Sequence, residues 1–339
     1  MQYEINHLHL ELSSFCNARC PCCPRNFQGY PYNMGYTESN LSLKDFKRIF
    51  SLTRLSRVHI AIINGNFGDA LMNPETPDIV AYMRRARHDM SIRVHTNGGA
   101  RDRDFWTKLA KLNVIGIFAI DGLSDTHSLY RQDTVFENVI RNAKTFIDAG
   151  GNAIWMATVF DHNRHQLPEM HKMAKDLGFM RLEERDTGRN EGPVYGRQGQ
   201  KVFFMQHDWQ YPDQVDGDFI QTQIKRVQTE LPKYIDQTPA TIDCWAVKER
   251  SVYVSADGHV YPCCWTGHDP HHFRSHNAVQ VWNQELSKYV RGNHGPTVGL
   301  ESAIAWFDDL AATWESNNQA QVCKRWCTKN DNNNSASCS

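Results

Sequence analysis

Strand-like and helix-like segments alternate along the first 185 residues of this 339-residue chain. Near the start, Leu8, Leu10 and Leu12 alternate with polar residues, as one face of a strand does, and Ser42 can cap the helix that follows. Further strands are predicted at 58–63, 92–95, 114–120, 154–160 and 179–183. Four further helices are predicted: one that begins at Thr76, one that includes Phe105, Leu109 and Leu112, one that opens with a capping box at 134–137, and one at 167–177. Buried strands that alternate with helices predict an α/β fold with a parallel sheet. About six βα units are too few for a closed barrel of eight, so we predict a partial (β/α)6 barrel.

A doubly wound sheet is the alternative fold. It is disfavoured because no Gly-x-Gly-x-x-Gly follows the first predicted strand.

Charge and apolar runs exclude several classes of protein. Lys plus Arg total 37 and Asp plus Glu total 38, so nothing in the composition supports bulk binding to nucleic acid or to an anionic membrane. The first residues lack the basic and apolar regions of a secretory signal, and the longest apolar run, 114–120, is far too short to span a bilayer. We therefore expect a cytoplasmic protein with no nucleic-acid or membrane partner.

The cysteines point to the chemistry. All ten fall in two groups, four within residues 16–23 and six from Cys244 onward. Disulfides are disfavoured in a reducing compartment, so spaced cysteines indicate metal binding. Cys16, Cys20 and Cys23 have the spacing Cys-x3-Cys-x2-Cys, which lets one loop hold three irons of a cubane cluster and leaves the fourth iron open. Zinc is the alternative, although zinc sites more often use paired Cys-x2-Cys units.

The first cysteine group directly follows the first predicted strand. In barrel-like βα folds the chemistry gathers at the carboxyl ends of the strands. Here the chain resembles the radical S-adenosylmethionine (SAM) superfamily, whose Cys-x3-Cys-x2-Cys loop has the same place. The resemblance covers nearly the whole chain and implies a partial barrel of the radical SAM type. Cys22 departs from the family pattern, which usually has an aromatic residue at that position.

Polar turns at the ends of the other strands extend this resemblance. The cofactor-binding residues that it implies are Gly68, Asp69, Thr96, Asn97, Asp121 and Asn163. Gly68-Asp69 is similar to the end of the Gly-Gly-Glu motif that holds the methionine amino group of SAM, and Asp replaces the longer Glu. Taken alone, each of these residues is also typical of an ordinary turn.

The second cysteine group resembles the auxiliary-cluster domain of radical SAM enzymes, more in its shorter twitch form than in the full SPASM form. The resemblance rests on Cys244 and Cys263, with a glycine between them, and on the later pair Cys323-x3-Cys327. It implies that these four cysteines ligate one auxiliary [4Fe-4S] cluster. Cys264 can take the place of Cys263, and structural zinc is the alternative ligand.

Other features around the second group are typical of the same domain. They are a hairpin at 251–261 turning on Asp257-Gly258, helices near 278–290 and 301–316, and the segment Val281-Trp282-Asn283. A histidine-rich loop of His268, His271, His272 and His276 is either a metal site or, more commonly, a solvated loop.

We divide the chain into four parts. They are a radical SAM partial barrel at 1–185, a bridging segment at 186–243 with one helix near 218–230, a twitch/SPASM-like auxiliary cluster domain at 244–330, and a disordered tail at 331–339.

The family resemblance implies three cofactors: a SAM-binding [4Fe-4S] cluster, an auxiliary [4Fe-4S] cluster and SAM itself. It implies reductive cleavage of SAM to a 5′-deoxyadenosyl radical, which abstracts hydrogen from the substrate. We expect the auxiliary cluster to transfer electrons, and an external electron donor such as flavodoxin or ferredoxin. Glu183, Glu184 and Arg185 follow the sixth strand and are the candidate catalytic residues that position substrate or accept a proton; a surface ion pair is the alternative.

Three functions compete. The first is modification of a peptide or protein side chain by cross-linking, epimerisation or oxidation, as in many family members with an auxiliary domain. The second is a small-molecule dehydrogenase acting on a sugar or alcohol, which fits a single auxiliary cluster and the expected absence of a leader-binding module before the first strand. The third is a non-catalytic iron–sulfur electron carrier or zinc scaffold, which the open-iron spacing and Gly68-Asp69 disfavour.

Overall fold

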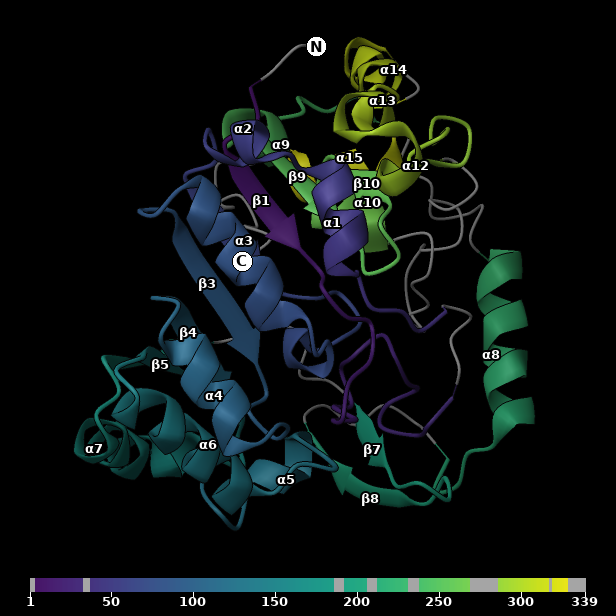
Figure 1. The fold of residues 1–339 in the computed structure, drawn as a ribbon. Coiled ribbons are helices and arrows are strands. Elements are labelled where there is room, and N and C mark those ends of the chain that lie inside the picture. Colours follow the sequence, from purple (N-terminus) through teal and green to yellow (C-terminus); the bar gives the residue numbers. More distant parts are fainter. Residues whose placement is uncertain are drawn as a thin grey trace.

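An eight-stranded sheet forms the centre of the molecule (Figure 1). The computed structural model describes residues 4–32, 37–185, 192–205, 212–230, 238–268, 286–316 and 319–328. The strand order is β10-β9-β1-β2-β3-β4-β5-β6. The strands are β1 His7–Leu10, β2 Ile60–Ile63, β3 Ser91–Thr96, β4 Ile115–Ala119, β5 Asn152–Thr158, β6 Arg181–Arg185, β9 Ser251–Val254 and β10 Val260–Tyr261. Neighbours from β9 to β6 are all parallel, which confirms the predicted α/β fold and partial barrel.

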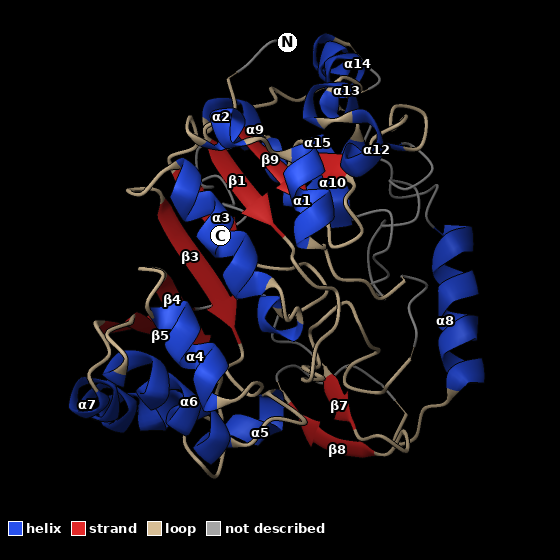
Figure 2. Ribbon diagram, in the orientation of Figure 1, coloured by secondary structure: helices blue, strands red, loops and turns tan. Residues whose placement is uncertain are grey.

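The helices between these strands cover one side of the sheet (Figure 2). They are α1 Leu43–Ile49, α2 Leu52–Leu55, α3 Thr76–Ala86, α4 Arg103–Ala110, α5 His127–Tyr130, α6 Phe136–Asp148 and α7 Leu167–Leu177, with short 3-10 turns η1 Ala70–Met72 and η2 Arg164–Gln166. The predicted helix ends are confirmed where a capping residue marks them in the sequence. Ser42 accepts the Asp45 N–H at 3.0 Å and caps α1, and Gly178, at φ 88°, ends α7.

The capping box predicted at 134–137 is wrong. Helix α6 has Val135 at its N-cap, with no side-chain capping bond. The Thr134 hydroxyl instead donates to the Arg131 carbonyl at 2.7 Å. A hydroxyl used in the preceding turn is not free to cap the helix.

Strand register separates an outer, helix-covered face from an inner face. Leu8 and Leu10 of β1 lie in the main apolar core, whereas His7 and His9 point to the opposite side. All four residues are buried, so both faces of β1 are covered. Because paired residues of a parallel sheet share a face, the inner face extends to other strands, and its members used below are His7, His9, Arg93, His95, Glu183, Arg185 and Tyr253.

The predicted hairpin around Asp257-Gly258 is confirmed, with β9 and β10 pairing antiparallel. It does more than form a local unit, because β9 pairs in parallel with β1, from His7 opposite Ser251 to Leu10 opposite Val254. The main sheet therefore includes strands from both sides of residue 244, and the domain division at that residue stays a prediction.

The segment at 186–243 contains the expected helix, α8 Gly217–Glu230, at the edge of the view in Figure 1. It also contains a hairpin that the sequence analysis missed, β7 Pro193–Tyr195 with β8 Lys201–Phe204. Tyr195 is fully buried beside Phe27, so this hairpin packs against the loop that follows the first cysteines.

Short helices make up the rest of the C-terminal part: α9 Trp245–Lys248, α10 Cys264–His268, α12 Gly295–Val298, α13 Leu300–Ile304, α14 Phe307–Ala311, the 3-10 turn η5 Ala312–Glu315, and α15 Gln321–Cys327. The helix predicted at 301–316 is broken because its residues join different cores. Ala303 packs in the main core, whereas Phe307 and Leu310 pack in a second, C-terminal core.

Several predictions lie outside the described residues. They are most of the helix near 278–290 with the segment 281–283, three histidines of the histidine-rich loop (His271, His272 and His276), and the tail at 331–339. Among the helices that the structure does describe, none is long and apolar enough to cross a membrane.

Candidate active site and second cysteine site

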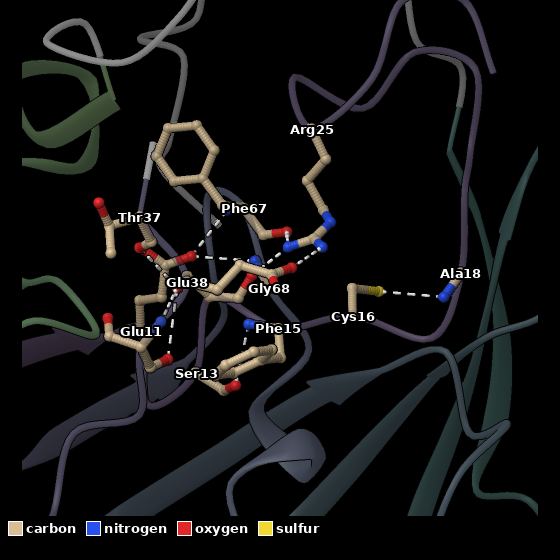
Figure 3. A network of polar contacts seen from close by, with 12 residues as sticks. Glu11, Ser13, Phe15, Cys16, Ala18, Arg25, Thr37, Glu38, Phe67 and Gly68 are labelled. Carbon is tan, nitrogen blue, oxygen red and sulfur yellow. Dashed lines mark hydrogen bonds and ion pairs between the residues drawn. The ribbon is translucent and has the colours of Figure 1, made fainter. Parts of the chain in front are cut away.

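The first cysteine group lies on a loop at the carboxyl end of β1 (Figure 3). Backbone bonds shape this loop: the Cys23 N–H donates to the Cys20 carbonyl at 2.9 Å, and the Ala18 N–H donates to the Cys16 sulfur at 3.4 Å. Burial raises the pKa of the Cys16 thiol, and the nearby Asp69, Cys20 and Cys23 raise it further. The three predicted ligands are therefore close together, and removal of their protons needs a compensating positive charge such as a metal.

Glu11 links the cysteine loop to the loop after β2. One of its carboxylate oxygens accepts the N–H groups of Phe67 and Gly68 at 2.7 and 3.0 Å, and the other accepts the Tyr253 hydroxyl at 2.6 Å. A Cβ atom on Gly68 would lie 1.8 Å from the Ser13 carbonyl oxygen, so only glycine fits this approach. The sequence analysis missed Glu11, although it continues the inward-facing alternation of His7 and His9.

Arg25 makes a second link between the same loops (Figure 3). Its guanidinium donates to the Phe67 carbonyl at 3.2 Å, to the Ser14 carbonyl, and to the Glu38 carboxylate at 2.6 Å. The backbone around Gly68 is thus held from two sides.

Asp69 binds protein groups in this structure. Its carboxylate accepts the Thr96 hydroxyl at 3.0 Å, the Asn97 N–H at 2.7 Å and the Leu71 N–H at 3.0 Å. The structure therefore brings three of the predicted cofactor-binding residues, Asp69, Thr96 and Asn97, together, and Gly68 is the neighbour of Asp69 in the chain. Burial raises the pKa of Asp69, and these hydrogen bonds oppose the rise. The role of Asp69 toward a SAM amino group stays a proposal.

Asn97 connects the end of β3 to the cysteine loop. Its amide donates to the Asn17 side-chain oxygen at 2.9 Å and to the Cys16 sulfur at 3.5 Å. Its own side-chain oxygen accepts the Gly99 N–H at 2.8 Å, which fixes the orientation of the amide.

Asp121 forms a buried ion pair beside the cysteine loop. It is 0% exposed, accepts the Arg131 Nε–H at 2.5 Å, and accepts the Thr158 N–H at 2.6 Å. Arg131 also donates to the Cys20 sulfur at 3.6 Å. Burial opposes its charge, but Asp121 and Cys20 raise the pKa of Arg131 well above the usual value. Arg131 was missed by the sequence analysis, because a lone arginine in a short helix carries no local signal.

Asn163 lies apart from this network. Its side chain accepts the Phe160 N–H at 2.7 Å and donates to the Thr158 carbonyl at 2.8 Å, so both ends of the amide close the turn after β5. Cys22 packs with Phe160, Val194 and Met205 in a small apolar cluster, at the position where the family pattern has an aromatic residue.

The three candidate catalytic residues on β6 separate between the two faces of the sheet. Glu183 and Arg185 lie on the inner face 3.7 Å apart, and Glu183 also accepts a bond from Arg181 at 2.8 Å. Glu184 lies on the outer face, where it pairs with His171 of α7 at 2.8 Å on the surface. The structure therefore leaves Glu183 and Arg185 facing the interior and places Glu184 away from it.

Four cysteines of the second group line one apolar pocket. They are the four predicted ligands, Cys244, Cys263, Cys323 and Cys327, and the remaining walls include Trp265, Phe307, Val322 and Trp326. Cys264 is not among the lining residues. Soft thiol donors in an apolar enclosure fit an iron–sulfur cluster in chemistry.

Three different pieces of structure hold these four cysteines. Cys244 is the N-cap of α9, Cys263 precedes α10, and Cys323 and Cys327 lie one helical turn apart on α15. The Asp243 N–H donates to the Cys327 carbonyl at 2.6 Å, which ties α15 to the start of α9. Within the described ranges, no three His, Cys, Asp or Glu side chains form a group that could hold a single metal ion.

Comparisons with known proteins agree with this geometry. Residues 10–174 match the model of the radical SAM superfamily. A structure of anSMEcpe with bound AdoMet (SAM) has 16% identity and a TM-score of 0.51, over 86% of this chain and 79% of that chain. SuiB of Streptococcus suis bound to S-adenosylmethionine has 13% identity and a TM-score of 0.52, over 95% and 78%. SuiB bound to its precursor peptide SuiA has 14% identity and a TM-score of 0.51, over 95% and 76%.

No curated protein matches the chain significantly. At these low identities the solved structures bear on the fold alone. The superfamily uses a [4Fe-4S] cluster and SAM, and the cysteine spacing, the strand-end loops and the matched residues 10–174 all agree with that chemistry. The chain is therefore an enzyme with a radical SAM domain, which residues 10–174 match.

Proposed function

We propose that this enzyme modifies a side chain of a peptide substrate by radical chemistry. Cys16, Cys20 and Cys23 hold the SAM-binding cluster, and the four cysteines of the C-terminal pocket hold an auxiliary cluster that transfers electrons. The observation that carries the proposal is the network that joins the three-cysteine loop to the ends of the neighbouring strands through Glu11, Asn97 and Arg131.

SAM and its cluster supply the superfamily's means of abstracting hydrogen from an unactivated carbon. The protein's own task is to orient them. Asn97 holds the Cys16 sulfur, Arg131 places a positive charge beside Cys20, and the backbone around Gly68 is fixed by Glu11. A site whose groups are held before the cofactor binds loses little free energy to reorganisation.

The peptide class is supported by the fold comparison. SuiB, which shares this fold across 95% of the chain, was solved with a precursor peptide. The Glu183–Arg185 pair on the inner face is placed to position such a substrate.

Release of 5′-deoxyadenosine tests the radical step. The protein is reconstituted anaerobically with iron and sulfide and then given SAM and dithionite, or flavodoxin as a biological donor. We expect release from wild type and from Cys22→Ala, the matched control in the same loop, and none from the variant with Cys16, Cys20 and Cys23 all changed to Ala. Wild-type protein with its full iron and no release would refute the assignment.

The substrate class is tested in the same assay. A pooled library of short synthetic peptides is expected to raise 5′-deoxyadenosine release above its uncoupled level, whereas pooled sugars and alcohols leave it unchanged. The reverse result would favour a small-molecule dehydrogenase.

A further inference from the structure

Three basic side chains gather on the inner face of the sheet. Arg93 and His95 lie on β3 and Arg185 ends β6, and the register places all three on the face away from the helices. Arg93 and Arg185 are exposed, and His95 is half-buried. We call these three residues the basic inner patch.

Little negative charge balances this patch. Across the described part of the chain, neither the Arg93 guanidinium nor the His95 ring makes a hydrogen bond or ion pair. Arg185 reaches Glu183 at 3.7 Å, but Glu183 also accepts a bond from Arg181 at 2.8 Å. Two inner-face arginines, Arg181 and Arg185, therefore share the Glu183 carboxylate.

The His95 ring responds to this excess of positive charge. Burial, and after it the nearby His9, Arg185 and Arg93, together lower the pKa of His95 to about 3. The ring is neutral at neutral pH, so it offers one N–H donor without adding a charge. Clustered cations without counter-ions raise the electrostatic free energy of the face, and an anionic ligand would lower it.

The patch lies near the first cysteine loop. Arg185 is in register with Thr158, whose N–H donates to Asp121 at 2.6 Å. Asp121 pairs with Arg131, which contacts the Cys20 sulfur at 3.6 Å. A ligand held by Arg185 is thus a few side chains away from the proposed site of radical formation.

We propose that the basic inner patch binds a carboxylate group of the substrate. A planar guanidinium forms paired hydrogen bonds with a carboxylate, and two such groups share the inner face with the neutral His95 donor. On the proposed function, this carboxylate belongs to an acidic residue of the peptide, close to the residue that is modified. The anion site itself does not depend on that function.

The test uses two labelled, end-blocked pentapeptides, one with a central glutamate and one with glutamine. Binding to the reconstituted enzyme with SAM, without reductant, is measured by fluorescence anisotropy. We expect the glutamate peptide to bind wild type about tenfold more tightly than the glutamine peptide. Arg93→Gln or Arg185→Gln is expected to reduce that preference to about twofold or less.

Arg141→Gln is the matched control, since Arg141 lies on α6 and bonds only to the exposed side of its own helix, at Asn138. It loses the same charge and is expected to keep the preference. Equal binding of both peptides by wild type would overturn the proposal, as would an equal loss in Arg141→Gln. Inorganic phosphate that displaces the glutamate peptide at concentrations below that peptide's Kd would assign the patch to phosphate and overturn the carboxylate assignment.

Because no reductant is present, binding is independent of SAM cleavage. If the enzyme releases 5′-deoxyadenosine but binds the two peptides equally, the carboxylate site is refuted and the proposed function stands. If it binds the glutamate peptide more tightly but releases no 5′-deoxyadenosine, the proposed function is refuted and the carboxylate site stands.

Discussion

The two cysteine groups are assembled in opposite ways. Cys16, Cys20 and Cys23 are close in sequence, on a loop shaped by its own backbone and by polar side chains from other strand ends. The four cysteines of the C-terminal pocket come from separate segments between residues 244 and 327, and their walls are aromatic and aliphatic. The first site is a set of polar groups around three thiols, and the second is part of an apolar core.

This difference separates two roles. A polar, pre-formed loop suits a cofactor that binds, reacts and leaves. An apolar pocket lined by four thiols suits a cluster that stays, because the energy of ligation adds to the stability of the fold. We therefore expect loss of the first site to remove activity and loss of the second to remove structure.

The largest expected effect is on stability. Cys244→Ala with Cys323→Ala removes two ligands from the apolar pocket, and we expect the free energy of unfolding to fall by roughly 5 kcal/mol. The triple Ala variant of the first loop should lose much less. Thermal unfolding by circular dichroism, with iron analysis of each sample, measures both. If the two variants lose the same amount of Tm, the second site is no more important for stability than the first.

Arg131→Met tests the polar network of the first site. It leaves Asp121, which is fully buried, without its ion-pair partner, so we expect a loss of about 3 kcal/mol in urea unfolding. Arg131→Lys keeps a charge but not the paired geometry and should lose less. Arg141→Met, on the surface of α6, is the control and should change little. An unchanged midpoint in Arg131→Met would mean that this pair does not support the loop.

Gly68→Ala tests the contact between the first two strand-end loops. Its Cβ would lie 1.8 Å from the Ser13 carbonyl oxygen, so the loops must separate at a cost of about 1–3 kcal/mol. SAM affinity, measured by equilibrium dialysis on reconstituted protein, should fall by about tenfold. Gly217→Ala, whose nearest neighbour would be 3.9 Å away, should bind as wild type does. Unchanged affinity in Gly68→Ala would show that this contact does not shape the site.

The smallest expected effect is the pH dependence of the β9–β10 turn. A hydrogen bond that the His259 ring donates to the Asp257 carboxylate raises the pKa of His259, so the folded state holds this proton more tightly than the unfolded state does. Its contribution is complete below the unfolded pKa of about 6.5 and is lost as pH rises through the folded pKa. Both side chains are partly exposed, so less than about 1 kcal/mol is at stake. The Tm difference between wild type and His259→Asn should be larger at pH 5.5 than at pH 8.5, and a constant difference would contradict this.

Sequence periodicity and spacing predicted the local features of the molecule. Strands β1 to β6 and the helix ending at Gly178 follow from apolar patterns and a glycine cap, and the two cysteine groups follow from their spacing. These signals lie within a few turns of the chain, where propensity and patterning act.

The missed features depend on distant residues. Glu11 matters because of Phe67, Gly68 and Tyr253, which are not near it in sequence. Arg131 likewise acquires its role only when α5 packs beside the cysteine loop. The segment 301–316 has the apolar spacing of one helix. It forms several short helices because its apolar side chains pack in two different cores.

The position of β1 between β2 and β9 has a consequence for biosynthesis. Residues 7–10 leave the ribosome before residues 251–254, so one edge of this strand pairs only when the later residues emerge. Until then an open edge with unpaired N–H and C=O groups is exposed beside the first cysteine loop. The Glu11–Tyr253 hydrogen bond joins the same two strands, so the loop reaches its final shape only after residue 253 has been made. Because this strand pairs late, the relative rates of iron–sulfur delivery and of sheet completion decide whether the first cysteine loop receives its cluster before or after it reaches its final shape.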